Sequence, residues 1–165
     1  MGLIVDEASA EAKSRMALIS LSKLILKLME NWRRGLIELT GHPPDYEATM
    51  ILSAIVVIAG DRLTRMQVEP EFQNLANVLP AGTLGKCNIS SISTATGLNR
   101  ETVRRKVKRL EAMGLVRRHP DNSILLSSEM TQSPIAQRIV RAQIDAVKQT
   151  VTQLARNQVL VEQPS

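Results

Sequence analysis

The sequence predicts a mainly α-helical protein with one small two-stranded β-wing and long helices near both ends. Three observations support this prediction. Apolar residues recur at helical spacing in the first and last parts of the 165-residue chain. One central segment has the pattern helix, tight turn, helix, hairpin. Aromatic residues make up only 2% of the chain, so any core must be aliphatic.

Residues 8–39 carry the first helical pattern. Its apolar positions follow steps of three and four, with Leu36 displaced by one, and they are Leu18, Leu21, Ile25, Leu28, Trp32 and Leu39. Gly41 and two prolines end this helix. Asp45 can cap the next one, "YEATMILSAIVVIAG", which is apolar on nearly every side and is expected in the middle of a bundle.

Residues 61–85 predict one or two short helices, bounded by Pro70 and Pro80. No function can be placed there from the sequence.

Residues 86–126 form one unit in the pattern. Asn88 can cap the short helix "ISSISTAT", Gly97 suits a turn with positive φ, and Asn99 can cap a second helix. That helix turns Val103, Val107 and Leu110 inward and ends at Gly114. Two β-type runs, "LVRR" and "SILL", flank the turn "HPDN". This order predicts a winged helix-turn-helix.

Ser133 and Pro134 then begin a long C-terminal helix. Its apolar residues recur at 4, 3, 4, 3, as in a coiled-coil seam, and they are Val140, Ile144, Val147, Val151 and Leu154. The tail "VLVEQPS" is expected to fray.

These patterns divide the chain into an N-terminal helical region (1–84), a winged helix-turn-helix (85–128) and a C-terminal dimerisation helix (129–165). Two long helices at opposite ends of a small chain have little core of their own to cover. We therefore expect a homodimer; the alternative is that the stripes pack within one subunit.

Positive charge is concentrated in a single segment. Residues 100–118 hold eight basic and two acidic residues, a net charge of +6, whereas the whole chain carries +5. The remaining residues therefore sum to −1. Double-stranded DNA is the partner that such a segment favours, because its major groove admits one helix between two lines of phosphates.

The inward stripe places Glu101, Arg105 and Lys108 on the opposite side of this helix, with Thr102, Arg104 and Arg109 on its flanks. No run of acidic residues nearby offsets these cations, so the sequence predicts that their charge is not consumed in pairs along the helix. The alternative is a helix face that is basic only because it is solvated.

The stretch "ISSISTATGLNRETVRRKVKRLEAMGLVRR" resembles the winged helix-turn-helix of bacterial transcription regulators. Within it, "NRETVRR" is similar to the recognition helix of the cyclic AMP receptor protein group. That resemblance implies base contacts from Arg100, Glu101 and Arg105. Arg suits guanine O6 and N7, and Glu suits cytosine N4. The other interpretation of Glu101 is a partner for the dipole at the helix N-terminus.

The upstream sequence is helical, unlike the β-barrel of that group, so cyclic nucleotide binding is not implied. The layout is more similar to MarR-like regulators, which dimerise through their terminal helices. Residues 61–85 exceed what that family places before its helix-turn-helix, and "HPDNS" lacks the arginine of its wing tip. Arg117, Arg118 and His119 are therefore expected to meet phosphate at the base of the wing.

The predicted DNA-contacting residues lie on the two helices and at the base of the wing. Hydroxyl groups on the outward side of the first helix are included because they can bond phosphates. The full set is Ser90, Ser91, Ser93, Thr94, Asn99, Arg100, Glu101, Thr102, Arg104, Arg105, Lys108, Arg109, Arg117, Arg118 and His119.

Other side chains favour no second function. The single cysteine, Cys87, is read as a small buried hydrophobe, with redox sensing as the alternative. Trp32, Tyr46 and Met50 are read as core, with an effector pocket as the alternative. We expect no catalytic residues, no metal site and no cofactor, because no known catalytic or ligand spacing is present.

The sequence thus predicts a cytoplasmic, sequence-specific regulator of transcription, more consistent with a repressor, acting as a homodimer on a near-palindromic site. Two alternatives stay open: a winged helix used to bind an acidic protein, and a DNA-binding protein of replication or plasmid maintenance.

Overall fold

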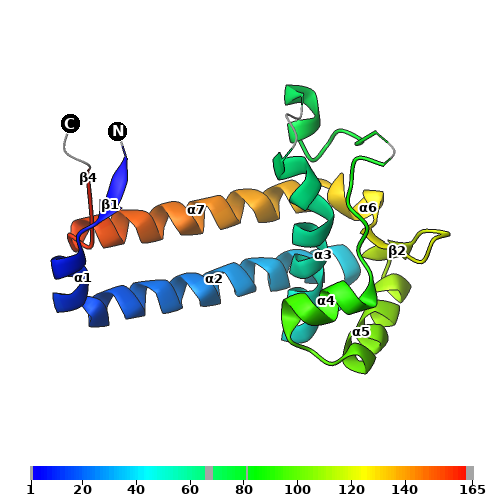
Figure 1. Ribbon diagram of the computed structural model, residues 1–165, viewed down its shortest axis with the longest axis horizontal. Coiled ribbons are helices and arrows are strands. Elements are labelled where there is room, and N and C mark those ends of the chain that lie inside the picture. The colour runs from blue at the N-terminus through cyan, green and yellow to red at the C-terminus, as the bar shows by residue number, and fades with distance from the viewer. Residues whose placement is uncertain (1, 66–68, 81, 163–165) are drawn as a thin grey trace. The chain divides into compact units, whose positions relative to one another are not determined.

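The computed structural model describes residues 2–65, 69–80 and 82–162 (Figure 1). Within these residues the chain is mainly helical, which confirms the predicted class. The helices are α1 (Glu7–Ala12), α2 (Ser14–Thr40), α3 (Tyr46–Arg65), the 3-10 helix η1 (Pro70–Gln73), α4 (Ile89–Thr96), α5 (Arg100–Ala112), α6 (Ser128–Thr131) and α7 (Pro134–Arg156). The strands are β1 (Leu3–Val5), β2 (Val116–Arg118), β3 (Ile124–Leu126) and β4 (Leu160–Glu162).

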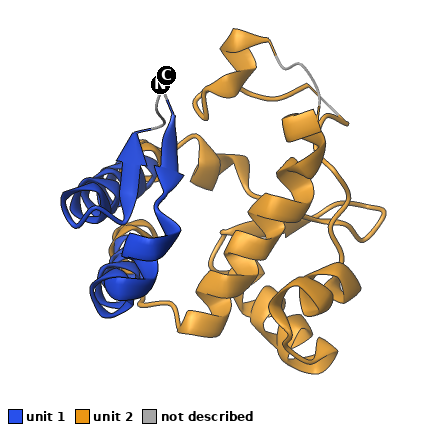
Figure 2. Ribbon diagram, turned by 60° about the vertical axis from the view of Figure 1, so that its left-hand side comes forward, with its two compact units in different colours: residues 1–32, 139–165 blue, residues 33–138 orange. Residues whose placement is uncertain are grey.

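The chain forms two compact units (Figure 2). Unit 1 combines residues 1–32 with residues 139–165, and unit 2 is the continuous stretch 33–138. Both divisions fall inside long helices, α2 and α7. The boundaries predicted after residues 84 and 128 do not coincide with them.

The helix boundaries of unit 2 follow from local side chains. Gly41 has φ 72° directly after α2, and its N–H donates to Ile37 O. At the start of α3, Asp45 Oδ1 accepts from Ala48 N at 2.8 Å. Both boundaries were predicted from the sequence.

Side-chain caps and a turn glycine also set the ends of α4 and the start of α5. Asn88 and Ser91 form a capping box, in which each side chain accepts a hydrogen bond from the other residue's N–H. Gly97 adopts φ 72° after α4, and Asn99 Oδ1 accepts from Thr102 N at 2.8 Å to begin α5. The sequence predicted these three positions.

The core of unit 2 forms where α3 packs against α4, α5 and β3. The apolar stripe of α5, Val103, Val107 and Leu110, is at most 1% exposed. Ile51 and Ile55 of α3 are fully buried.

Helix α3 does not have the surroundings predicted for it. Its buried residues cover more than half of its circumference, but Val57 on the remaining side is 69% exposed. The expectation of a helix in the middle of a bundle was therefore wrong for that side, because α4, α5 and β3 leave it uncovered.

The hairpin pairs β2 with β3 in antiparallel register, with Val116 opposite Leu126 and Arg118 opposite Ile124. Its turn places Asn122 at φ 64°, and Asn122 N donates to His119 O at 2.8 Å. Ile124 N also donates to Cys87 O at 2.7 Å, which ties the hairpin to the segment before α4.

The segment between α3 and α4 contains η1, which begins at Pro70. Gly85 N donates to Ala59 O at 2.8 Å and returns the chain to α3. One short helix is thus present in the described part of this segment, within the range that was predicted.

In unit 1, α2 and α7 lie side by side and run antiparallel (Figure 1). Asn31 Nδ2 donates to Ala142 O at 3.1 Å and to Gln143 Oε1 at 3.2 Å. Gln143 Nε2 donates to Leu28 O at 3.1 Å. These bonds set the level at which the two helices meet.

The chain ends form an unpredicted second sheet. β1 pairs with β4 in antiparallel register, with Leu3 opposite Glu162 and Val5 opposite Leu160. The tail from Val159 to Glu162 is therefore ordered, and the prediction that it frays was wrong for these residues. Residues 163–165 of the tail lie outside the described residues.

The predicted apolar stripes of α2 and α7 are largely exposed. Leu18, Leu21 and Ile25 are 66%, 46% and 58% exposed. On α7, Val140, Ile144 and Val147 are 43%, 61% and 44% exposed, whereas Leu154 is buried. The alternative that the stripes pack within one subunit is therefore contradicted for these six residues.

No helix among the residues that the structure describes combines the length and the apolar character needed to cross a membrane.

We predict that Gly97→Ala lowers the free energy of unfolding by about 1 kcal/mol, because an L-residue is strained at φ 72°. A Cβ at Gly97 meets nothing within 4 Å, so backbone strain is the only cost. Gly60→Ala is the matched control, since its Cβ also meets nothing and Gly60 lies within α3. It should raise the free energy by about 0.5–1 kcal/mol in urea unfolding. Equal effects of the two changes would contradict the strain argument.

Candidate nucleic-acid interface

The outward face of α5 presents cations because the other face is held in the core. Arg105, Lys108 and Arg109 are exposed, as predicted from the inward positions of Val103, Val107 and Leu110. Within the described part of the chain, no ion pair engages Arg105 or Lys108. The positive charge of Arg109 helps to lower the pKa of Asp45, although no ion pair joins these two described side chains.

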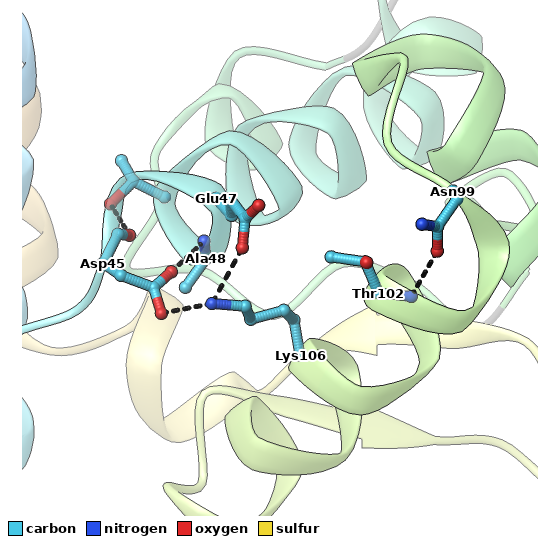
Figure 3. Close-up of polar contacts among 7 residues, drawn as sticks. Asp45, Glu47, Ala48, Asn99, Thr102 and Lys106 are labelled. Atoms are coloured by element: carbon cyan, nitrogen blue, oxygen red, sulfur yellow. Dashed lines mark hydrogen bonds and ion pairs between the residues drawn. The ribbon is translucent and has the colours of Figure 1, made fainter.

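Lys106 points toward Asp45 and Glu47 at the start of α3 (Figure 3). Its ammonium group pairs with Asp45 and lies 2.9 Å from Glu47 Oε2. The Lys106 side chain is only 14% exposed. This cation therefore ties α5 to the N-terminus of α3.

Sequence reasoning missed this contact because Asp45 is 61 residues from Lys106. An available signal was the acidic pair Asp45 and Glu47 at the start of a helix. The sequence alone does not show which lysine that pair meets.

The environment shifts both charged partners toward their ionised forms. Burial acts to raise the pKa of Asp45, but hydrogen bonds from Lys106 and from Ala48 N–H outweigh it, so the pKa falls below 3.8. Hydrogen bonds to Asp45 and Glu47 raise the pKa of Lys106. The pair is thus ionised at neutral pH.

Two arginines at the start of α5 have partners as well. Arg104 pairs with Glu101 one turn earlier on the same helix. The Arg100 guanidinium donates to Ser90 Oγ at 2.9 Å and so links α5 to α4. The prediction that the charge of this helix is not consumed in pairs along it was wrong for Arg104, because Glu101 on the same helix neutralises it. Lys106 is neutralised by Asp45 and Glu47, which lie outside α5.

The hydroxyl groups of α4 divide into two kinds. Ser90 and Thr94 are exposed, whereas Ser91 and Ser93 are half-buried. Ser91 completes the capping box, and Ser93 Oγ donates to Leu98 O at 2.6 Å. Ser91 and Ser93 therefore serve the local fold, which corrects the expectation that all four hydroxyls face outward.

Basic residues also surround the base of the hairpin. Arg117 is exposed, and Arg118 Nε lies 3.2 Å from Glu111 Oε2. His119 Nδ1 lies 3.1 Å from Asp121 Oδ1, at the turn.

Asp121 holds this turn to the segment before α4. Lys86 Nζ lies 2.9 Å from Asp121 Oδ2, and Ser123 donates to Oδ1 through both its N–H and its hydroxyl. Hydrogen bonds from Lys86, then Ser123 and His119, hold the pKa of Asp121 well below its usual range. Asp121 therefore places a stable negative charge beside His119.

Cys87 is completely buried. Burial raises the pKa of its thiol, and Ser91 Oγ at 3.9 Å opposes this only in part. A buried, protonated thiol fits the structural interpretation of Cys87 better than redox sensing.

The aromatic and methionine side chains considered as core are not all buried. Tyr46 is 65% exposed and Met50 is 43% exposed, while Trp32 is half-buried. The prediction that Tyr46 and Met50 fill core was wrong, because both lie on the uncovered side of α3.

Comparison with family models, curated proteins and solved structures found no match to this chain. Function therefore has to be inferred from the arrangement of the side chains.

The arrangement favours an anionic partner. Arg100, Arg105, Lys108 and Arg117 are exposed cations without an acidic partner among the described residues. Together with Arg109 they keep their charge available to solvent, while Lys106 on the inner flank of α5 is neutralised.

We predict that Lys106→Met lowers the free energy of unfolding by about 1 kcal/mol at neutral pH, because it strands Asp45 and Glu47. The folded state lowers the pKa of Asp45, so its contribution is complete above pH 3.8 and fades as the pH falls through the folded-state pKa. The destabilisation should therefore shrink in acid. Urea unfolding at neutral and acidic pH measures it.

The control is Lys108→Met, which removes an exposed lysine of the same helix. It should leave stability nearly unchanged at both pH values. A destabilisation equal to that of Lys106→Met would show that the ion pair contributes nothing specific.

Proposed function

We propose that the chain is a winged helix-turn-helix protein that binds double-stranded DNA and regulates transcription as a homodimer. The observation that carries this proposal is the division of charge around α5. Its apolar stripe is buried, Lys106 is neutralised on the inner flank, and the exposed face keeps Arg105, Lys108 and Arg109. Here α4 and α5 are the helix-turn-helix and β2–β3 is the wing.

Helix α5 is the element proposed to enter the major groove. Arg100 and Arg105 then read guanine, and Glu101 reads cytosine. In the free protein Glu101 is 77% exposed and already pairs with Arg104. Base reading by Glu101 therefore requires this exposed pair to open or to be shared with the DNA.

Phosphate contacts are assigned to residues that flank α5. Ser90 and Thr94 are exposed on α4, and Arg117 is exposed on the wing. Arg118 and His119 contribute less than expected because Glu111 and Asp121 lie beside them. The wing tip has Asp121 in place of a free cation, so insertion into the minor groove is not part of the proposal.

A dimer would present two copies of α5 to a near-palindromic site. Half-sites would then be separated by about 34–36 Å or a multiple of it. Repression is the simpler mode of action, because occupation of a promoter is enough to block it.

The test is a salt titration of binding to random duplex DNA, followed by selection from a random pool. A steep negative slope with an enriched inverted repeat is expected. A steep slope without enrichment would favour a role in replication or plasmid maintenance. Absence of binding at low salt would overturn the proposal and favour an acidic protein partner.

We predict that Lys108→Met weakens binding to all duplexes alike and reduces the slope of log K against log salt by about 1. Lys106→Met is the matched control, because Asp45 and Glu47 already neutralise that lysine. It should leave the slope unchanged. If both changes reduced the slope equally, the assignment of the outward face would be wrong.

We predict that Arg105→Ala costs about 1–3 kcal/mol at one base position and relaxes specificity there, since the bidentate contact to guanine is lost. Binding to a set of single-base variants of the selected site measures the change. A uniform loss over all variants would instead identify Arg105 as a phosphate contact.

A further inference from the structure

The exposed stripes of α2 and α7 lie about a quarter turn away from the sides on which these helices meet. A helix turns about 100° per residue. On α2, Ser20 and Asn31 mark the side toward α7. Leu21 and Ile25 are rotated away from that side about the helix axis, in the sense in which the helix winds from its N-terminus to its C-terminus.

Helix α7 shows the same offset. Ile139, Gln143 and Ala146 mark its inner side, where Ile139 and Ala146 are at most 6% exposed. Val140 and Val147 are rotated from them in the same sense as the stripe of α2.

Because the helices are antiparallel and face each other, equal rotations of the same sense bring both stripes to one side of the pair. The hydrogen bonds of Asn31 and Gln143 place residues 28–31 level with residues 142–143. Because the helices are antiparallel, a residue nearer the N-terminus of α2 lies level with a residue nearer the C-terminus of α7. Ile25 is therefore level with Val147. The two stripes therefore form one apolar face, consisting of Leu18, Leu21, Ile25, Val140, Ile144 and Val147.

Between its two stripes this apolar face carries no charged side chain among the described residues. Arg138 and Asp145 of α7 lie on the opposite side of that helix, whereas the exposed Arg141 and Lys148 border the outer edge of the face beside Ile144. A face that meets an identical copy must oppose its own charges, so a face with charges only at its edge is self-complementary at its centre.

The size of the apolar face suits a dimer. Residues 14–32 span about 27 Å, and two helices about 10 Å wide give a projected area on the order of 500 Å². Stable interfaces bury about 800 Å² of corrugated surface on each partner. A patch of this size is comparable to the largest apolar patch of a typical soluble monomer, and such patches are often binding sites.

We propose that the apolar face binds the same face of a second copy, so that α2 and α7 of both chains form a four-helix layer. This inference deepens the proposed function by assigning the residues that hold the dimer together. It depends on unit 1 alone and not on DNA.

Sedimentation equilibrium of the full chain at micromolar concentration tests the inference. The wild type should have twice the chain mass of 18.2 kDa. Ile25→Lys and Ile144→Lys should each raise the dimer dissociation constant by about 100-fold, because a charge then faces its own copy across an apolar interface. Both side chains are exposed in the single chain, so circular dichroism should remain unchanged.

The matched control is Ile19→Lys. Ile19 is 41% exposed and lies on the opposite side of α2 from the apolar face. It should leave the mass at the dimer value. A wild type with the mass of one chain, or equal dissociation by Ile19→Lys and Ile25→Lys, would overturn the inference.

DNA binding separates this inference from the proposed function. A dimer that shows no salt-dependent binding to duplex DNA would support the dimer interface at the apolar face and contradict the proposed DNA-binding function. A wild type that binds DNA but has the mass of one chain would contradict dimerisation through the apolar face and support DNA binding.

Discussion

Burial of one stripe on α5 is the constraint on which the candidate interface depends. Val103, Val107 and Leu110 pack into the core that α3, α4 and β3 complete. Once they are inside, the helical repeat determines where every other side chain of α5 points. The cations gather on the exposed face for this reason and without any attraction among them. Lys106 is the exception, and its ion pair with Asp45 and Glu47 adds a second fixed point that opposes rotation of α5 about its axis.

Local signals predicted unit 2 well. The caps at Asp45, Asn88 and Asn99 and the turn glycine at Gly97 act within a few residues, so the sequence states them directly. The buried stripe of α5 follows from periodicity alone. Contacts between distant residues were not predictable in this way. The β1–β4 pairing joins the two ends of the chain, and three-residue strands carry too little pattern to identify a partner.

The candidate site was predicted in outline and corrected in detail. Periodicity identified the exposed cations of α5, because exposure follows from the helical repeat. It could not show that Ser91 and Ser93 serve the local fold, since that depends on the turn geometry around Asn88 and Leu98. Nor could it show that Glu111 and Asp121 lie beside Arg118 and His119, because β2 and the turn bring them together. The exposed side of α3 was misjudged because composition indicates apolar character but not what covers it.

The two units differ in how much of the chain must be synthesised before each of them can form. Unit 2 is continuous, so all of its contacts are available once residue 138 has been made. Unit 1 needs α2 from the beginning of the chain and both α7 and β4 from its end. During synthesis α2 is therefore made before α7 can pack beside it, and its apolar side chains stay open to other surfaces. A folded unit 2 between them shortens the distance that the two ends must search, because it replaces more than a hundred flexible residues by one compact body. The order of elements along this chain thus favours completion of the basic α5 surface before the ends of the chain meet.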